Sequence, residues 1–137
     1  MTADTAAPTP LDLLTEARTL IARPCAWTQG TGARDASGDS IGVEHQDAVS
    51  WCATGALLCA MYRRADSLEV PPALQRARNG ADAILADTMR RLTGERYTAV
   101  TTYNDSTNHG CMVHLFDIAI SDAEKTAAQG ASGHARL

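Results

Sequence analysis

The longest apolar run of the chain lies in the stretch DAVSWCATGALLCAMYRR, residues 47–64. Apolar residues recur there at helical spacing along one face, and Leu57, Leu58 and Met61 make the opposite face apolar as well. Asp47 can cap such a helix, and the small residues along it allow neighbouring helices to approach closely. The stretch therefore predicts a central helix that is buried on most sides.

Three more segments have apolar residues at helical spacing, and we predict helices at residues 10–23, 73–92 and about 112–123. Thr9 has the side chain of an N-cap, and Pro24 prevents the first of these helices from continuing. Residues 97–103 combine β-branched and aromatic side chains, so we expect an extended segment there, followed by a loop at residues 104–108.

The segment between the first two helices is rich in glycine, and it predicts a hairpin that pairs residues 27–34 with residues 40–43. An ordered loop lying over the core is the alternative. The fold class is then α+β and mainly α, with three or four helices packed around the central helix and a small β-hairpin. We expect a single globular domain at residues 9–128, with disordered tails at residues 1–8 and 129–137.

Composition limits the classes of function. The net charge is −4, with 12 basic and 16 acidic residues, so we expect no generic nucleic-acid binding. No apolar run approaches the roughly 20 residues of a membrane span, and the first ten residues lack the charged and apolar regions of a secretory signal. We therefore expect no membrane association, a cytoplasmic location, and four cysteines present as thiols.

Four short motifs resemble an uncharacterised family of small proteins, a domain of unknown function met in actinobacterial and phage genomes. The motifs are Trp27-Thr-Gln-Gly30, Trp51-Cys-Ala-Thr-Gly-Ala-Leu57, Tyr103-Asn-Asp105 and Val113-His-Leu-Phe-Asp-Ile-Ala-Ile120. The resemblance covers about residues 11–120. It implies no known activity and supplies no catalytic residue, so function must be argued from the residues themselves.

Cys52 lies early in the predicted central helix, where the helix dipole lowers the pKa of a thiol. Together with His109 and Asp105 it has the residue types of a cysteine-dependent hydrolase or transferase, with His114 and Asn104 as other candidates for the two partners. The alternative is that Cys52 is a small core residue at a helix contact, as Cys59 would be.

Three of the few aromatic side chains lie beside polar groups at predicted loops or helix edges, as a small-molecule pocket requires. The candidate ligand-binding residues are Trp27, Gln29, Trp51, Tyr103, Asn104 and Asp105. The alternative is that the rings fill the core while Asn104 and Asp105 cap the last helix. We expect any site where the segment after the first helix, the start of the central helix and residues 103–109 meet.

A metal site could gather His45, Cys52, Asp105 and His109, but the spacing argues against it. His109 and His114 lie five residues apart, on different faces of a helix, and the chain has no CxxC, HxxxH or HExxH motif. The sequence also lacks a phosphate-binding loop. We therefore expect neither a metal nor a cofactor.

The sequence favours a non-enzymatic accessory protein that binds a small ligand or a protein partner. The family resemblance implies an association with phages or mobile elements. A cysteine-dependent hydrolase or transferase using Cys52 is the first alternative. The second is a structural helical module that self-associates into a homo-oligomer through faces of small residues.

Overall fold

The computed structural model describes residues 7–135. Helix α1 (Pro10–Leu20) begins as predicted, because Thr9 and Asp12 form a capping box in which each side chain accepts a hydrogen bond from the other's backbone N–H. It ends three residues before the predicted limit. Arg23 is extended in front of Pro24, which opens the short 3-10 helix η2 (Pro24–Ala26).

Helix α2 (Ala53–Ala65) is the central helix, and it packs against α1, α3 and α4. Seven of its 13 residues are buried, as the sequence predicts. The predicted start at Asp47 is wrong, because Ser50 and Trp51 form a strand and Cys52 is the N-cap. Strand pairing of Ser50 with Arg34 holds this part of the chain extended until the helix begins.

Helices α3 (Pro72–Leu92) and α5 (His109–Ala135) complete the helical core with α1 and α2. The α3 helix runs without a break through Asn79 and Gly80. Gly80 has a packing role, since a Cβ atom there would lie 2.8 Å from Pro10 Cγ. The absence of a side chain lets α1 and α3 approach closely.

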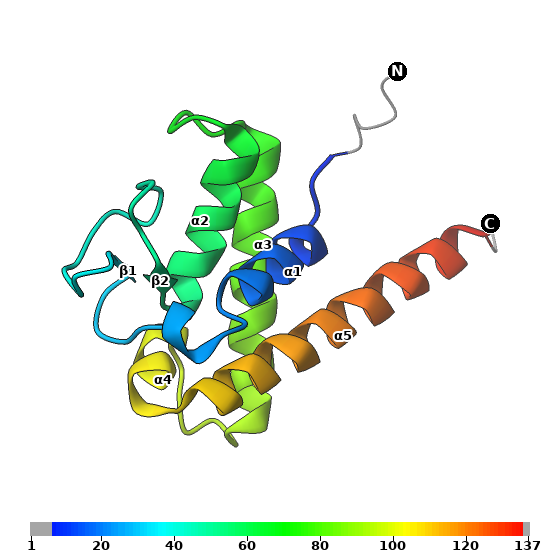
Figure 1. The fold of residues 1–137 in the computed structure, drawn as a ribbon. Helices are drawn as coiled ribbons and strands as arrows, with labels where there is room; N and C mark the ends of the chain where they lie inside the picture. Colours follow the sequence, from blue (N-terminus) through cyan, green and yellow to red (C-terminus); the bar gives the residue numbers. More distant parts are fainter. Residues whose placement is uncertain (1–6, 136–137) are drawn as a thin grey trace.

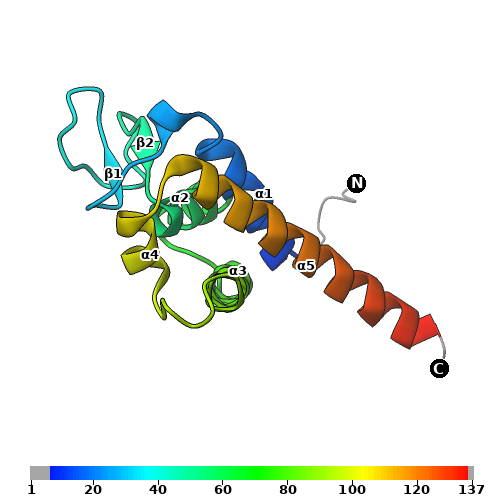
Figure 2. The same cartoon turned by 90° about the horizontal axis from the view of Figure 1, so that it is seen from below.

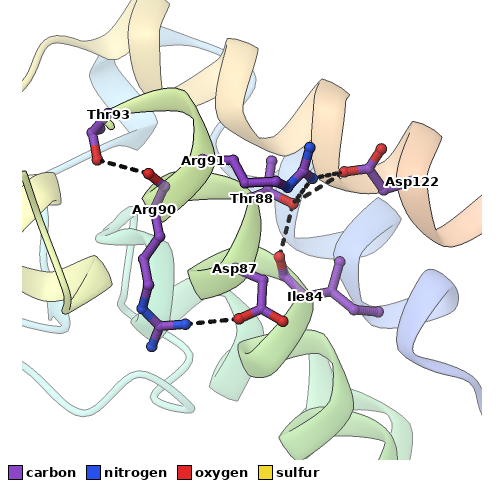
Figure 3. A network of polar contacts seen from close by, with 7 residues as sticks. All are labelled: Ile84, Asp87, Thr88, Arg90, Arg91, Thr93 and Asp122. Atoms are coloured by element: carbon purple, nitrogen blue, oxygen red, sulfur yellow. Dashed lines mark hydrogen bonds and ion pairs between the residues drawn. The ribbon is translucent and has the colours of Figure 1, made fainter. Parts of the chain in front are cut away.

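A polar contact joins α3 to α5 (Figure 3). The buried Thr88 hydroxyl donates to the Ile84 carbonyl at 2.8 Å, and it also lies 3.3 Å from the Asp122 carboxylate. Arg91 forms an ion pair with the same carboxylate. These three side chains connect the two helices (Figure 3).

The sheet has two antiparallel strands, β1 (Ala33–Arg34) and β2 (Ser50–Trp51), in which Ala33 pairs with Trp51. A small antiparallel sheet was predicted, but its second strand is not residues 40–43. Only one isolated bridge, from Arg34 to Ser40, joins β1 to that segment. A longer connection, residues 35–49, instead joins β1 to β2, which lies just before α2.

The short helix α4 (Val100–Ser106) replaces the predicted extended segment and the start of the predicted loop. High β propensity is a weak local preference, and packing of α4 against α2 and α3 overrides it. The buried Asn104 side chain points into this contact and is hydrogen-bonded there. The predicted loop is therefore reduced to a brief connection around Asn108.

The fold class is α+β and mainly α, as predicted (Figures 1 and 2). The far half of α5 projects beyond the other helices in both views. The helix is continuous through residues 129–135, where the sequence predicts a disordered tail, whereas residues 1–6 and 136–137 of the predicted tails lie outside the described residues. Over residues 7–135, no helix combines the length and the apolar character that crossing a membrane requires.

Candidate functional site

A cavity of about 270 Å³ lies where three segments distant in the sequence meet: the loop before β1, the start of α2, and α4. This is the place at which the sequence predicts a site. Its lining consists of Gly30, Thr31, Gly32, Val43, Cys52, Thr54, Gly55, Leu58, Thr101, Asn104 and Asp105. We call this cavity the α2–α4 pocket.

Asn104 connects all three segments, and the residue is only 1% exposed. Its Oδ1 atom accepts from Trp27 Nε1 at 2.8 Å and from the Ala53 N–H, at the first residue of α2, at 3.0 Å. Its Nδ2 atom donates to the Thr28 carbonyl at 3.0 Å and to Asp105 Oδ1 at 3.2 Å. One amide therefore uses every hydrogen-bonding group it has to hold the pocket together.

Gln29 and Asp105 add a second set of contacts between the loop and α4. Gln29 Nε2 donates to the carbonyl oxygens of Asn104 and Thr107, at 2.8 and 2.9 Å. The Gly30 N–H donates to Asp105 Oδ1 at 2.9 Å. These bonds place the glycine-containing loop against α4 along one wall of the pocket.

Gly32 and Gly55 form the closest backbone approach at the pocket. The Gly32 carbonyl accepts from the Cys52 N–H at 3.1 Å, and a Cβ atom on Gly55 would lie only 2.0 Å from that same carbonyl oxygen. No side chain fits in this space. Glycine at position 55 is therefore needed for the loop to pack on the first turn of α2.

Cys52 is a buried residue, 7% exposed, and serves as the N-cap of α2, because its Sγ atom accepts from the Gly55 N–H at 3.2 Å. Burial raises the pKa of the thiol, and the nearby Asp105 carboxylate acts in the same direction. The N–H groups of Gly55 and Thr54 lower that pKa, but burial is the larger effect. The thiol is therefore protonated near neutral pH. A cysteine nucleophile would have to be a thiolate at that pH.

His109 does not line the pocket. Its ring packs against Trp27 with the centroids 6.0 Å apart, and its Nε2 atom lies 2.7 Å from the Ile21 carbonyl oxygen, to which it donates. Cys52 and Asp105 share the pocket lining, but the predicted imidazole partner is directed to the end of α1. His114, the other imidazole considered, is exposed on α5.

The predicted aromatic walls also lie outside the pocket lining. Trp51 is buried, donates from Nε1 to the Val43 carbonyl at 3.1 Å, and has the Arg63 guanidinium 5.7 Å from its ring centroid. Tyr103 packs edge-on against Tyr97, with the ring centroids 5.2 Å apart. Trp27 contacts the pocket indirectly, because its indole N–H donates to the side chain of the lining residue Asn104.

The whole pocket falls within one matched sequence region. A family model described as a family of unknown function (DUF6197) matches residues 5–122. The chain belongs to this family. No curated protein and no solved structure matches the chain. The DUF6197 match includes every residue of the pocket lining and stops before the far half of α5.

The lining residues of this DUF6197 domain that the sequence did not predict are residues 30–32, Val43, Thr54, Gly55, Leu58 and Thr101. The glycines at positions 30 and 32 are a signal in the sequence, but they predict a hairpin and not a pocket wall, and they do not match a phosphate-binding loop. Thr54 and Leu58 share a face of α2 at i and i+4, and that spacing could have placed them together.

The described part of the DUF6197 domain shows no gathering of metal-binding side chains. Over the residues that the structure describes, no three His, Cys, Asp or Glu side chains come close enough together to hold an ion. Of these four residue types, the lining of the α2–α4 pocket contains Cys52 and Asp105.

Proposed function

We propose that the chain is a non-enzymatic binding protein and that its ligand is a small molecule held in the α2–α4 pocket. The observation that carries the proposal is the Asn104 side chain, which joins the loop, α2 and α4 around a cavity with all its hydrogen-bonding groups in use. Ligand pockets are typically built before the ligand arrives, with a few polar groups placed among apolar ones.

The framework around the pocket supports a preformed site. Over the described residues, no buried side-chain nitrogen or oxygen lacks a hydrogen-bond partner. Such a network holds one geometry, because any alternative would leave buried polar groups unsatisfied. At about 270 Å³ the cavity lies just below the usual range of pockets for drug-sized ligands, so the ligand is small.

Binding is favoured over the cysteine-dependent alternative because of the state of Cys52. The thiol has a pKa raised by burial and accepts a hydrogen bond as a helix cap. Among the described residues that line the pocket there is no imidazole to remove its proton.

Binding is also favoured over self-association. The exposed large apolar side chains described are Val49, Leu68 and Leu92, which lie on three separate segments, and single exposed apolar side chains are ordinary on a monomer.

The four free cysteines fit a reducing compartment, and we place the protein in the cytoplasm on that ground.

Blocking the pocket from its rim tests the proposal. Thr101 and Thr102 are neighbouring exposed residues of α4, but only Thr101 lines the pocket. Thr101→Trp should fill the opening, and Thr102→Trp adds the same ring outside it. A library of fragments of up to about ten non-hydrogen atoms is screened by protein-observed ¹⁵N–¹H NMR against the native chain and both variants.

We expect fragments that shift the amide signals of Gly30, Gly32 and Gly55 in the native chain and in Thr102→Trp, and that lose this effect in Thr101→Trp. A library without any fragment that shifts these signals contradicts the proposal. Shifts of equal size in the two tryptophan variants contradict it as well, because the fragments would then bind elsewhere.

A further inference from the structure

We propose that the α2–α4 pocket takes a small organic cation, an amine or guanidine with a short apolar body. This inference rests on the proposed binding function and names the chemistry of its ligand. It follows from three properties of the lining: its charge, the use of the α2 N-terminus by the protein itself, and the division of the wall into polar and apolar parts.

The charge of the lining comes from one residue. Asp105 is the single ionisable carboxylate among the lining residues, and no Lys, Arg or His accompanies it there. Its Oδ1 atom accepts from the Gly30 N–H and from Asn104 Nδ2. Its Oδ2 atom makes no hydrogen bond to any described residue, so one carboxylate oxygen remains to accept from a ligand. A charged donor gives the stronger bond to such an oxygen.

The start of α2 is a poor anion site, although a helix N-terminus is ordinarily a good one. The Ala53 N–H donates to Asn104 Oδ1, and the Gly55 N–H donates to Cys52 Sγ. The Ala56 N–H donates to the Cys52 carbonyl at 2.8 Å. Three of the first four N–H groups of α2, which would otherwise attract a phosphate or carboxylate, are therefore engaged within the protein.

Hydroxyl groups and apolar side chains share the rest of the wall. The Thr54 and Thr101 hydroxyls make no hydrogen bond to any described residue and, with Asp105 Oδ2, offer three oxygen acceptors to the three donors of an ammonium group. Val43 and Leu58 supply an apolar surface for a short carbon chain. A volume of about 270 Å³ equals roughly nine water molecules, which fits a ligand of about that many non-hydrogen atoms.

A metal ion fits this lining poorly. Calcium and magnesium are held by several oxygen ligands, commonly with more than one carboxylate. The described residues contain no cluster of three metal-ligating side chains. An organic cation needs only one carboxylate and gains from the apolar part of the wall.

Three probes with one carbon skeleton test the charge preference: 3-methylbutylamine, 3-methylbutanol and 3-methylbutanoate. Each is titrated into the full chain at pH 7, where the amine is protonated, and the Gly30, Gly32 and Gly55 amides are followed by ¹⁵N–¹H NMR. We expect the amine to bind at least about fivefold more tightly than the alcohol, with the acid weakest. Equal binding of all three, or a preference for the acid, overturns the inference.

Asp105→Asn removes the charge while leaving an oxygen for the Gly30 N–H, and Asp39→Asn removes the same charge from an exposed loop residue outside the lining. The amine should lose its advantage over the alcohol in Asp105→Asn and keep it in Asp39→Asn. The inference is overturned if the amine loses its advantage over the alcohol in both variants, or in neither. If no probe binds but library fragments pass the Thr101 and Thr102 comparison, only the ligand class is wrong. If neither the probes nor the library fragments bind, the proposed binding function is wrong as well.

Discussion

At the scale of single residues, Asn104 combines burial with a complete set of hydrogen bonds. It satisfies the indole of Trp27, the first N–H of α2 and the Thr28 carbonyl at once. A leucine of similar size would fill its volume but would leave those three groups without their partner. Each buried polar group left unsatisfied costs about 1–3 kcal/mol.

We therefore expect Asn104→Leu to lower the free energy of unfolding by about 3 kcal/mol or more. Asn104→Asp should also destabilise the fold, since a carboxylate cannot donate to the Thr28 carbonyl. Urea unfolding followed by circular dichroism measures both, with the exposed Thr102→Ala as control. If Asn104→Leu lowers the free energy of unfolding no more than the control does, the Asn104 hydrogen bonds do not stabilise the fold as described.

The four cysteines divide into two exposed and two buried thiols, and this division predicts their reactivity. Cys25 and Cys111 are exposed, whereas burial raises the pKa of the Cys52 and Cys59 thiols. We expect Cys25 and Cys111 to be alkylated first near pH 7.5 and the other two only as the protein opens. Mass spectrometry of iodoacetamide-treated protein over time resolves the sites. Fast labelling of Cys52 in the folded chain would revive the nucleophile hypothesis.

At the scale of elements, the contact between the loop and α2 depends on Gly55. Alanine favours a helix over glycine by about 1 kcal/mol, yet at position 55 its Cβ would lie 2.0 Å from the Gly32 carbonyl oxygen. We expect Gly55→Ala to cost about 2 kcal/mol, because the loop must move away. Gly110, in the first turn of α5, has room for a Cβ, its nearest atom there being Asn108 Oδ1 at 3.5 Å.

Gly110→Ala is the matched control and should stabilise the protein by up to about 1 kcal/mol. Thermal unfolding of the two variants should then shift in opposite directions. A neutral or stabilising Gly55→Ala would mean that the loop is not held against α2.

The helices and the fold class were predictable because their apolar spacing and end signals are local. Thr9 with Asp12, and Pro24, mark the first helix in the sequence alone. The errors concern segments whose structure depends on distant partners. β2 is a strand because Arg34 pairs with Ser50, and α4 is helical because it packs on α2 and α3, so neither could be deduced from its own residues.

The place of the candidate site was predicted better than its composition. Cys52, Asn104 and Asp105 do line one cavity, whereas Trp27 and Gln29 hold it from outside. Residue types identify groups able to take part, but which of them face a cavity depends on packing. Whether the lining binds a ligand stays a prediction.

At the scale of the whole molecule, the far half of α5 stands apart from the other helices (Figures 1 and 2). Ala123 is the last described buried residue of the helix, and residues 124–129 are exposed. We expect a chain ending at residue 128 to keep its free energy of unfolding within about 0.5 kcal/mol, as for exposed sites in general. Ending the chain at residue 118 also removes the buried Ala119 and Ala123 and should lower the melting temperature clearly.

Calorimetry of the two truncated chains beside the full one makes the comparison. A clear loss of stability in the longer truncated chain would contradict the prediction, since it would require the projecting part of α5 to contribute to the core.

The bonds from Trp27 and Gln29 to Asn104 and Thr107 span 75–78 residues of chain. Contacts of such separation form only after a long loop has closed, and here α4 must already be docked for them to form. We expect the loop before β1 to be the last part of the chain to fold and the first to open. The amides of residues 28–32 should then exchange with deuterium faster than those at the centre of α2, which need global unfolding. The pocket would therefore open and close many times within the lifetime of one folded core.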